Sequence, residues 1–149
     1  MIWIVAIVVI GFILYRFFFD FFSARKKDNE ELQMQTLEEK FSVLVKLINE
    51  AAFNGKGKVM DRVPKFFNLY ADGSNQIVTF LYGTGHLTIT WRYKYLEIEV
   101  VHQRQFNNVR NISVSDQHKM AERMISEMSI VVENHKINVT KSMFNLKIE

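Results

Sequence analysis

The first 22 residues constrain this chain more than any other feature, because they are apolar on every side of a helix. Residues 2–15 carry no charged side chain, and five phenylalanines continue the run to position 22. At 1.5 Å per residue, a helix of this length extends about 31 Å, close to the thickness of a bilayer's hydrocarbon core. The domain that follows is too small to bury such a helix all round. We therefore expect a transmembrane anchor over residues 1–24.

A cleaved signal peptide is the main alternative for this segment. A signal peptide has a hydrophobic region of about 7–15 residues between a basic start and a cleavage site flanked by small residues. No basic residue precedes Ile2, and residues 21–25 offer no convincing pattern of small residues for cleavage. The sequence thus favours an uncleaved anchor.

Charged residues mark the inner end of the anchor. Arg16 and Asp20 lie four residues apart, so we expect them to pair near the headgroups, and a functional intramembrane charge is the alternative. Basic residues stay on the cytoplasmic side of a membrane, and residues 25–27 are all basic. We expect an inner (plasma) membrane location with the N-terminus outside and the domain in the cytoplasm. The residues expected to position the anchor are Trp3, Tyr15, Arg16, Asp20, Arg25, Lys26 and Lys27.

The net charge of +3 belongs entirely to residues 1–27, and residues 28–149 contain 15 basic and 15 acidic side chains. A neutral domain gives no reason to expect a nucleic-acid partner. Residues 28–54 carry six acids and two bases, whereas residues 55–114 carry eight bases and four acids. Either these two segments attract each other, or the basic side chains meet anionic headgroups or an acidic partner. The second alternative would involve Lys56, Lys58, Arg62 and Lys65.

Residues 28–54 have the periodicity of one long helix. Their apolar side chains recur at alternating steps of three and four, at Met34, Leu37, Phe41, Leu44, Ile48 and Ala51. This seam is shorter than three heptads, which favours packing onto the domain's own sheet over a coiled coil. Helix pairing would be limited to Met34 and Leu37. We expect a juxtamembrane linker over residues 25–33 and a single domain over residues 34–149.

Strand patterns follow this helix. Turn clusters at residues 71–75 and 83–85 separate successive strands. Residues 87–91 and 96–100 alternate between apolar and polar side chains, which predicts a hairpin with a tight turn at residues 93–94. Residues 102–112 fit either a fifth strand or a loop. The register that follows from this turn places Thr90 opposite Glu97 and Thr88 opposite Glu99.

A second helix begins at Ser113 or Ser115, where Asp116 completes a capping box after Ser113. Its apolar stripe is more typical of core filling than of a binding groove, and consists of Met120, Met124, Met128, Val131 and His135. Residues from Asn138 onward are expected to form a last strand or a loose tail. The fold class is α+β: an N-terminal transmembrane helix, a long helix, a four- or five-stranded antiparallel sheet and a C-terminal helix packed on one face.

No catalytic or ligand-binding signature stands out. Cysteine is absent, and the four histidines do not occur at metal-ligand spacing. Residues 55–58 lack the pattern of a phosphate-binding loop, and residues 83–85 are better explained as a turn that needs glycine. Glu97 and Glu99 could act as paired carboxylates, but an amphipathic strand produces the same alternation. We expect no catalytic residue, cofactor or metal.

These features favour a non-enzymatic interaction domain at a membrane, such as an accessory or scaffold subunit of a bacterial or phage membrane complex. The expected partners are the lipid bilayer and another membrane or membrane-proximal protein, including a second copy of the chain. An immunity or antitoxin protein is one alternative. A small-ligand sensor or enzyme with a site around Trp91, Tyr95, Glu97 and Glu99 is another. The candidate interaction residues are Met34, Leu37, Thr88, Thr90, Arg92, Tyr95, Glu97 and Glu99.

Overall fold

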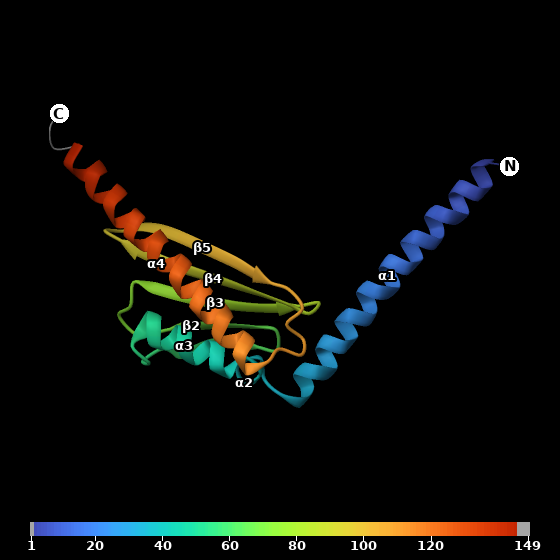
Figure 1. Cartoon of the computed structure of the whole chain (residues 1–149), viewed down its shortest axis with the longest axis horizontal. Coiled ribbons are helices and arrows are strands. Elements are labelled where there is room, and N and C mark those ends of the chain that lie inside the picture. Colours follow the sequence, from blue (N-terminus) through green and yellow to red (C-terminus); the bar gives the residue numbers. More distant parts are fainter. Residues whose placement is uncertain (1, 146–149) are drawn as a thin grey trace.

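The computed structural model describes residues 2–145, with their side chains except at positions 2–6, 24, 31, 33, 34 and 145. A long N-terminal helix, α1 (Ile2–Met34), leads into a head formed by the residues that follow it (Figure 1). This arrangement confirms the α+β fold class. The elements of the head are α2 (Leu37–Lys40), α3 (Ser42–Phe53), β1 (Lys58–Val63), β2 (Phe66–Tyr70), β3 (Gln76–Gly83), β4 (His86–Tyr95), β5 (Ile98–Phe106) and α4 (Val114–Asn145).

The single helix expected over residues 28–54 is broken at two places. α1 includes residues 25–33, so the expected linker is helical. Thr36 then starts α2, because its hydroxyl accepts the Glu39 N–H at 3.2 Å while its own N–H donates to the Glu39 carboxylate at 2.8 Å. This capping box satisfies two backbone donors at the new helix start. Phe41 leaves the helical conformation (φ −108°) and separates α2 from α3.

A side chain of α4 bridges the second break. The Gln117 carbonyl oxygen accepts the Leu44 N–H at 3.2 Å, and its amide nitrogen donates to the Lys40 carbonyl at 3.1 Å. A continuous helix would join these two backbone groups directly. Gln117 is buried, so its two bonds satisfy backbone groups that the core would otherwise leave without partners.

The five strands form an antiparallel sheet in the order β1-β2-β3-β4-β5. β1 is one edge, and a bulge between Met60 and Val63 interrupts its pairing with β2. This irregular, mostly exposed strand lacks the alternation by which a strand is recognised in sequence. β5 is the other edge and pairs with β4 without interruption, so residues 102–106 belong to a strand and the loop begins after them.

The β4–β5 hairpin turns later than expected. Its turn residues are Leu96 and Glu97, with φ of 48° and 64°, so the prediction of a turn at residues 93–94 is wrong. Two residues at positive φ give the twist that suits a hairpin, but neither residue here is the glycine, asparagine or aspartate that usually marks such a turn.

The register of this hairpin follows from its turn, so the expected facing pairs are also wrong. Thr90 pairs with Gln103, and Thr88 pairs with Gln105, in place of the two glutamates. The partner positions moved by an even number of residues, and side chains alternate with a period of two. Thr88 and Thr90 therefore lie on the polar face of the sheet, as the alternation predicts.

The core lies between the sheet and the layer formed by α3 and α4. Side chains from β2, β3 and β4 fill it from one side, and the helices fill it from the other. Met120, Met124 and Met128 are at most 7% exposed, which confirms that the methionine stripe fills the core.

α4 begins where the sequence predicts and extends further. Ser113 caps it, because the hydroxyl accepts the Asp116 N–H at 3.1 Å. The helix continues to Asn145, so the expected change to a strand or tail at Asn138 is wrong for the described residues. Residues 114–145 contain neither glycine nor proline to stop it. Residues 146–149 lie outside the described residues.

Candidate interaction surfaces

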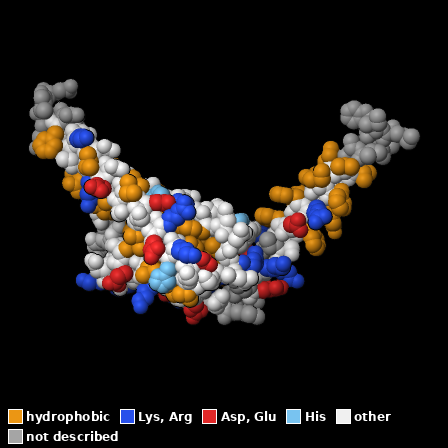
Figure 2. Space-filling model, in the orientation of Figure 1, with side chains coloured by type: hydrophobic (Ala, Val, Ile, Leu, Met, Phe, Trp, Pro, Cys, Tyr) orange, Lys and Arg blue, Asp and Glu red, His pale blue; other side chains and the backbone are white. Residues whose placement is uncertain are grey.

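The N-terminal half of α1 is uncovered. From residue 7 to residue 22 every side chain is exposed, and Figure 2 shows hydrophobic side chains around the helix. Within the described part of the chain, α1 is the one helix long and apolar enough to cross a membrane, over Ile7–Glu30. A signal sequence near an N-terminus has the same two properties. The expected pairing of Arg16 with Asp20 stays a prediction.

The other end of α1 is attached to the head through a buried carboxylate. Asp28 is 0% exposed, and Arg110 Nη2 lies 2.7 Å from its Oδ1 as an ion pair without hydrogen-bond alignment. The Thr84 N–H donates to Oδ2, and Lys65 Nζ lies 3.9 Å from the same oxygen. These partners come from the β1–β2, β3–β4 and β5–α4 connections at one end of the sheet. We call this set of four residues the Asp28 clasp.

The backbone conformation of the β3–β4 turn positions Thr84 in the Asp28 clasp. Thr84 and Gly85 have φ of 52° and 75°, which confirms that residues 83–85 serve turn geometry. The Val109 N–H donates to the Gly85 carbonyl at 3.0 Å, so the β5–α4 loop that carries Arg110 is held on this turn. The turn thereby fixes both the Thr84 N–H and the guanidinium on Asp28. Because the Asp28 carboxylate is fully buried, its charge depends on these partners for compensation.

α1 crosses the end of the sheet in the direction from β1 to β5. Leu32 lies beside Val63, the last residue of β1, and Pro64 of the β1–β2 connection. One helical turn nearer the N-terminus, Asp28 meets the β3–β4 turn and the β5–α4 loop. The apolar half of α1 continues past this end of the sheet and away from the head, as Figure 1 shows.

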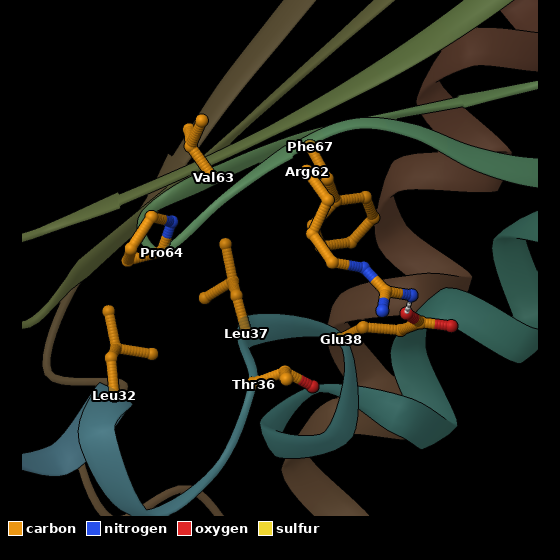
Figure 3. Close-up of a pocket in the computed structure, with 8 residues that line it drawn as sticks. All are labelled: Leu32, Thr36, Leu37, Glu38, Arg62, Val63, Pro64 and Phe67. Atoms are coloured by element: carbon orange, nitrogen blue, oxygen red, sulfur yellow. Dashed lines mark hydrogen bonds and ion pairs between the residues drawn. The ribbon is translucent and has the colours of Figure 1, made fainter.

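A small cavity lies where α1, α2 and the β1–β2 hairpin meet (Figure 3). Its volume is about 270 Å³, and apolar side chains such as Leu37 and Phe67 line it. At its side, Arg62 and Glu38 pair with each other. Sites for small molecules usually span about 300–1,000 Å³ and present polar groups to the ligand. This cavity therefore gives little support to a small-ligand function.

The face of the sheet opposite α3 and α4 carries no helix, and we call it the open face. A polar row crosses its centre, and the exposed apolar side chains of Met60, Leu81 and Val101 flank this row at 47–50% exposure. Polar positions that alternate with exposed apolar ones resemble the composition of a non-obligate protein interface. The row pairs strand to strand as Asn68, Thr79, Thr90 and Gln103.

Part of the polar row is held in place by its own hydrogen bonds. The Thr79 hydroxyl donates to the Asn68 side-chain oxygen at 2.7 Å, and the Asn68 nitrogen donates to Asp61 at 2.8 Å. Asp61 adopts a positive φ of 52° beside the bulge of β1. The irregular edge strand thus supplies an acceptor that orients the amide, and this end of the open face is pre-organised.

The structure brings some of the expected interaction residues together and separates others. Tyr95 lies on the helix-covered face, with Lys136 Nζ 5.9 Å from its ring centroid, and Glu97 lies in the β4–β5 turn. Leu37 is buried in the core, and the side chain of Met34 lies outside the described residues. The residues that share the open face are Thr88, Thr90, Arg92 and Glu99.

The side chains proposed for a ligand or enzyme site on the sheet do not converge. Trp91 is buried on the helix-covered face, where its indole N–H donates to Gln76 at 2.9 Å. Glu99 lies on the open face. Residues on opposite faces of a sheet cannot line one site, so this constellation offers no shared pocket.

Three of the basic residues proposed to meet headgroups or an acidic partner are paired within the chain. Lys58 Nζ lies 3.0 Å from Asp72, Arg62 pairs with Glu38, and Lys65 belongs to the clasp. The last two join the acidic helical segment to the basic sheet layer. These contacts favour the attraction between segments that the charge asymmetry suggests.

A charged cluster between β5 and α4 was not apparent from the sequence. Glu127 of α4 accepts hydrogen bonds from Arg104 and, at 3.3 Å, from Arg123, and it lies 3.1 Å from His102 Nε2. The hydrogen bond from Arg104 is the main cause that lowers the pKa of Glu127 below its ordinary value. Alternate positions 102 and 104 on one strand, with residues 123 and 127 one helical turn apart, are the only sequence signal of this cluster.

Neither a metal site among the described residues nor a match to a known protein identifies the chain. The part of the chain that the structure describes contains no group of three or more His, Asp or Glu side chains placed to hold a metal ion. Comparison with protein-family models, with curated proteins and with solved structures finds no match. The surfaces of this molecule are therefore the basis for its proposed function.

Proposed function

We propose that this chain is a single-pass membrane protein whose head binds another membrane or membrane-proximal protein, as an accessory or scaffold subunit of a membrane complex. The observation that carries the proposal is the continuity of α1, which is apolar and uncovered at one end and clasped to the head at the other. A tether raises the local concentration of the head near membrane partners, so modest contacts suffice. A clasped helix also restricts the orientation in which the head meets them.

The open face is the surface we assign to the protein partner. It combines an ordered polar row with exposed apolar side chains and lies on the side of the sheet away from α3 and α4. Thr90 lies at the centre of the row, between strands β3 and β5. A partner that covered this face would bury both the apolar side chains and the polar row.

The anchor is tested by alkaline extraction of membranes from cells that produce the full chain, followed by measurement of its intact mass. We expect the protein to stay in the membrane pellet with its N-terminal residues present. Release into the supernatant, or a mature mass that lacks the apolar segment, would contradict the anchor and favour a cleaved signal sequence.

The partner surface is tested with a photo-crosslinking amino acid at Thr90 in cells. Ser42, an exposed residue of α3 on the other side of the head, is the matched control position. We expect a reproducible higher-mass adduct from position 90 and none from position 42, with mass spectrometry separating a second copy from a different protein. Monomer alone at both positions would count against an interaction domain that uses this face.

A further inference from the structure

We propose that the outer edge of β5 binds an extended segment of a membrane-proximal partner protein, which joins the sheet as an additional strand. The inference rests on the proposed binding of a protein partner by the open face, and it names the form in which that partner binds. β5 is an edge strand of the sheet, so a strand added there would extend the open face without a break.

The main chain of β5 presents every second residue to the edge. Residues 96–97 form a two-residue turn, so Tyr95 and Ile98 beside it exchange both of their N–H···O=C hydrogen bonds. The Lys94 N–H accordingly points the other way and donates to the Asn75 carbonyl on the β3 side at 2.8 Å. From Ile98 onward, alternate residues of β5 bond to β4 and the residues between them point outward. The outward residues are Glu99, Val101, Gln103 and Gln105.

The outward main-chain groups of β5 are open to another chain. Within the described part of the chain, the N–H and C=O groups of these four residues have no hydrogen-bond partner. Their side chains are exposed and lie on the open face. α4 contacts β5 on the other face, where Glu127 binds Arg104 and lies beside His102. A row of regularly spaced main-chain donors and acceptors is complementary to an extended strand.

The two edges of the sheet differ in the features that prevent strand addition. β1 has a bulge between Met60 and Val63 and a positive φ at Asp61, and Pro64 follows it directly. β5 keeps its register over nine residues and contains no bulge, proline or lysine. Natural edge strands usually carry such features, because they stop an edge from pairing with other chains. Their absence from β5 favours the use of this edge in binding.

The side chains along the edge indicate what the added strand carries. Val101 is 48% exposed at the middle of the outward row, and Gln103 beside it is uncharged. An aromatic or β-branched side chain directly opposite a β-branched one stabilises a pair of strands. We therefore assign the edge to a segment with such a side chain opposite Val101, while main-chain hydrogen bonds supply the affinity.

A second copy of the chain does not fit this edge. Antiparallel pairing of two β5 strands requires a two-fold axis perpendicular to the joined sheet. The two Asp28 clasps would then lie at opposite ends of that sheet. α1 continues from the clasp away from the head (Figure 1), so the two anchors would project in opposite directions and could not enter one bilayer. The edge is therefore assigned to a different protein.

The experiment places a photo-crosslinking amino acid at Glu99 or at Gln105 of the full chain in cells and sequences the crosslinked peptides. These positions lie at the two ends of the outward row, about 20 Å apart along the strand. We expect both to crosslink to one segment of one partner, at points about six residues apart. A helix needs about 13 residues to cover the same distance, so the spacing distinguishes a strand from a helix.

Gln103→Pro tests the main-chain hydrogen bonds directly. Proline removes the outward N–H at the middle of the edge but leaves the pairing with β4 in place, because an edge strand tolerates proline where its N–H faces solvent. The yield of the adduct from position 99 should fall about ten-fold, since the partner loses a main-chain donor. Gln103→Ala keeps the N–H and should retain the yield. Near-UV circular dichroism checks the folding of both variants, and if Gln103→Pro does not fold, the crosslink spacing decides alone.

Several outcomes would overturn the inference. Crosslinked points about 13 residues apart or in separate segments would do so, as would equal yields from folded Gln103→Pro and Gln103→Ala. An adduct from Thr90 without one from position 99 or 105 would also overturn it, but would leave the proposed binding by the open face intact. The absence of adducts from all three positions would overturn both. Crosslinks to β5 of a second copy would overturn the choice of a different protein.

Discussion

The two long helices of this molecule are nearly equal in length and are attached to the head in opposite ways. α1 has 33 residues, and its described contacts with the head are centred on one buried carboxylate, held by two cations and a backbone N–H, with Leu32 packed near it. α4 has 32 residues and is held by a row of buried methionines and by Gln117. Two helices of nearly equal length are therefore attached to the same head by different interactions. Charge at a few atoms positions α1, whereas buried apolar area positions α4.

The largest effect in this comparison should come from the apolar attachment of α4. Met124 is 0% exposed, and Met124→Ala should lower the free energy of unfolding of the head by about 2–5 kcal/mol, because it leaves a cavity in the core. Chemical denaturation of the full chain in detergent, followed by near-UV circular dichroism, measures this change. Ile130→Ala on the exposed side of the same helix should change stability by no more than about 0.5 kcal/mol. Equal effects of the two substitutions would contradict the described packing of α4.

The ionic attachment of α1 should respond differently. Asp28→Ala removes the carboxylate from Arg110 and Lys65, whose side chains are each 28% exposed and can turn toward water. The cost should therefore be about 1–3 kcal/mol, and it should fall on the docking of α1 more than on the core. Spin labels at Phe22→Cys and Gln105→Cys, on α1 and β5, should give a broader distance distribution in this variant.

Glu30→Gln is the matched control for the clasp. Glu30 is exposed on the same helix and pairs with exposed Lys26 at 3.8 Å, an interaction of little energetic value. The distance distribution should stay narrow in Glu30→Gln. If Asp28→Ala leaves the distribution as narrow as this control, the clasp does not position α1.

The junction between the two attachments should be sensitive to the helix cap. Thr36→Ala removes the hydroxyl that accepts the Glu39 N–H, and should cost about 1 kcal/mol in the free energy of unfolding. Thr36→Ser keeps the acceptor and should retain most of the stability. Denaturation midpoints of the two variants, compared at equal slope, measure the difference; a Thr36→Ser variant as unstable as Thr36→Ala would show that the hydroxyl is not the cause.

The smallest effect should come from the charged cluster around Glu127, between α4 and β5. The pKa of Glu127 is lowered in the folded state, mainly by the hydrogen bond from Arg104, so its ionised form is favoured by folding. The resulting stability is present above the unfolded pKa of about 4.3 and is lost as pH falls through the lower folded value. Glu127→Gln should therefore cost up to about 1 kcal/mol near neutral pH and little at a pH below both values. Unfolding curves at the two pH values provide the check, and a pH-independent difference would contradict the assignment.

The sequence predicts the parts of the fold that depend on local patterns. The apolar run identifies α1, the Ser113–Asp116 box marks the start of α4, and the methionine spacing gives its buried face. The break before α2 was also readable, because Thr36 and Glu39 form the capping-box pattern, but the apolar periodicity that continues across it concealed the signal. The turn at Leu96 and Glu97 was not readable, since residues at positive φ there are neither glycine nor asparagine.

The clasp and the open face could not be predicted from the sequence, and the reason is a different one. Asp28, Lys65, Thr84 and Arg110 are far apart in the chain, and each is ordinary at its own position. Only the order of the strands brings their three connections to one end of the sheet. Alternation assigned Thr88 and Thr90 to a polar face, but the contacts across the sheet depended on the register. Tertiary topology, and not residue type, creates both surfaces.

The unbroken path of α1 into the clasp has a mechanical consequence. A helix that spans a bilayer tilts until its apolar length matches the thickness of the membrane. α1 is about 50 Å long and is continuous between its apolar residues and Asp28. A change in the tilt of α1 should therefore rotate the head together with the helix. If α1 spans the bilayer, the thickness of the membrane determines the height of α4 and the angle of the open face above the lipid.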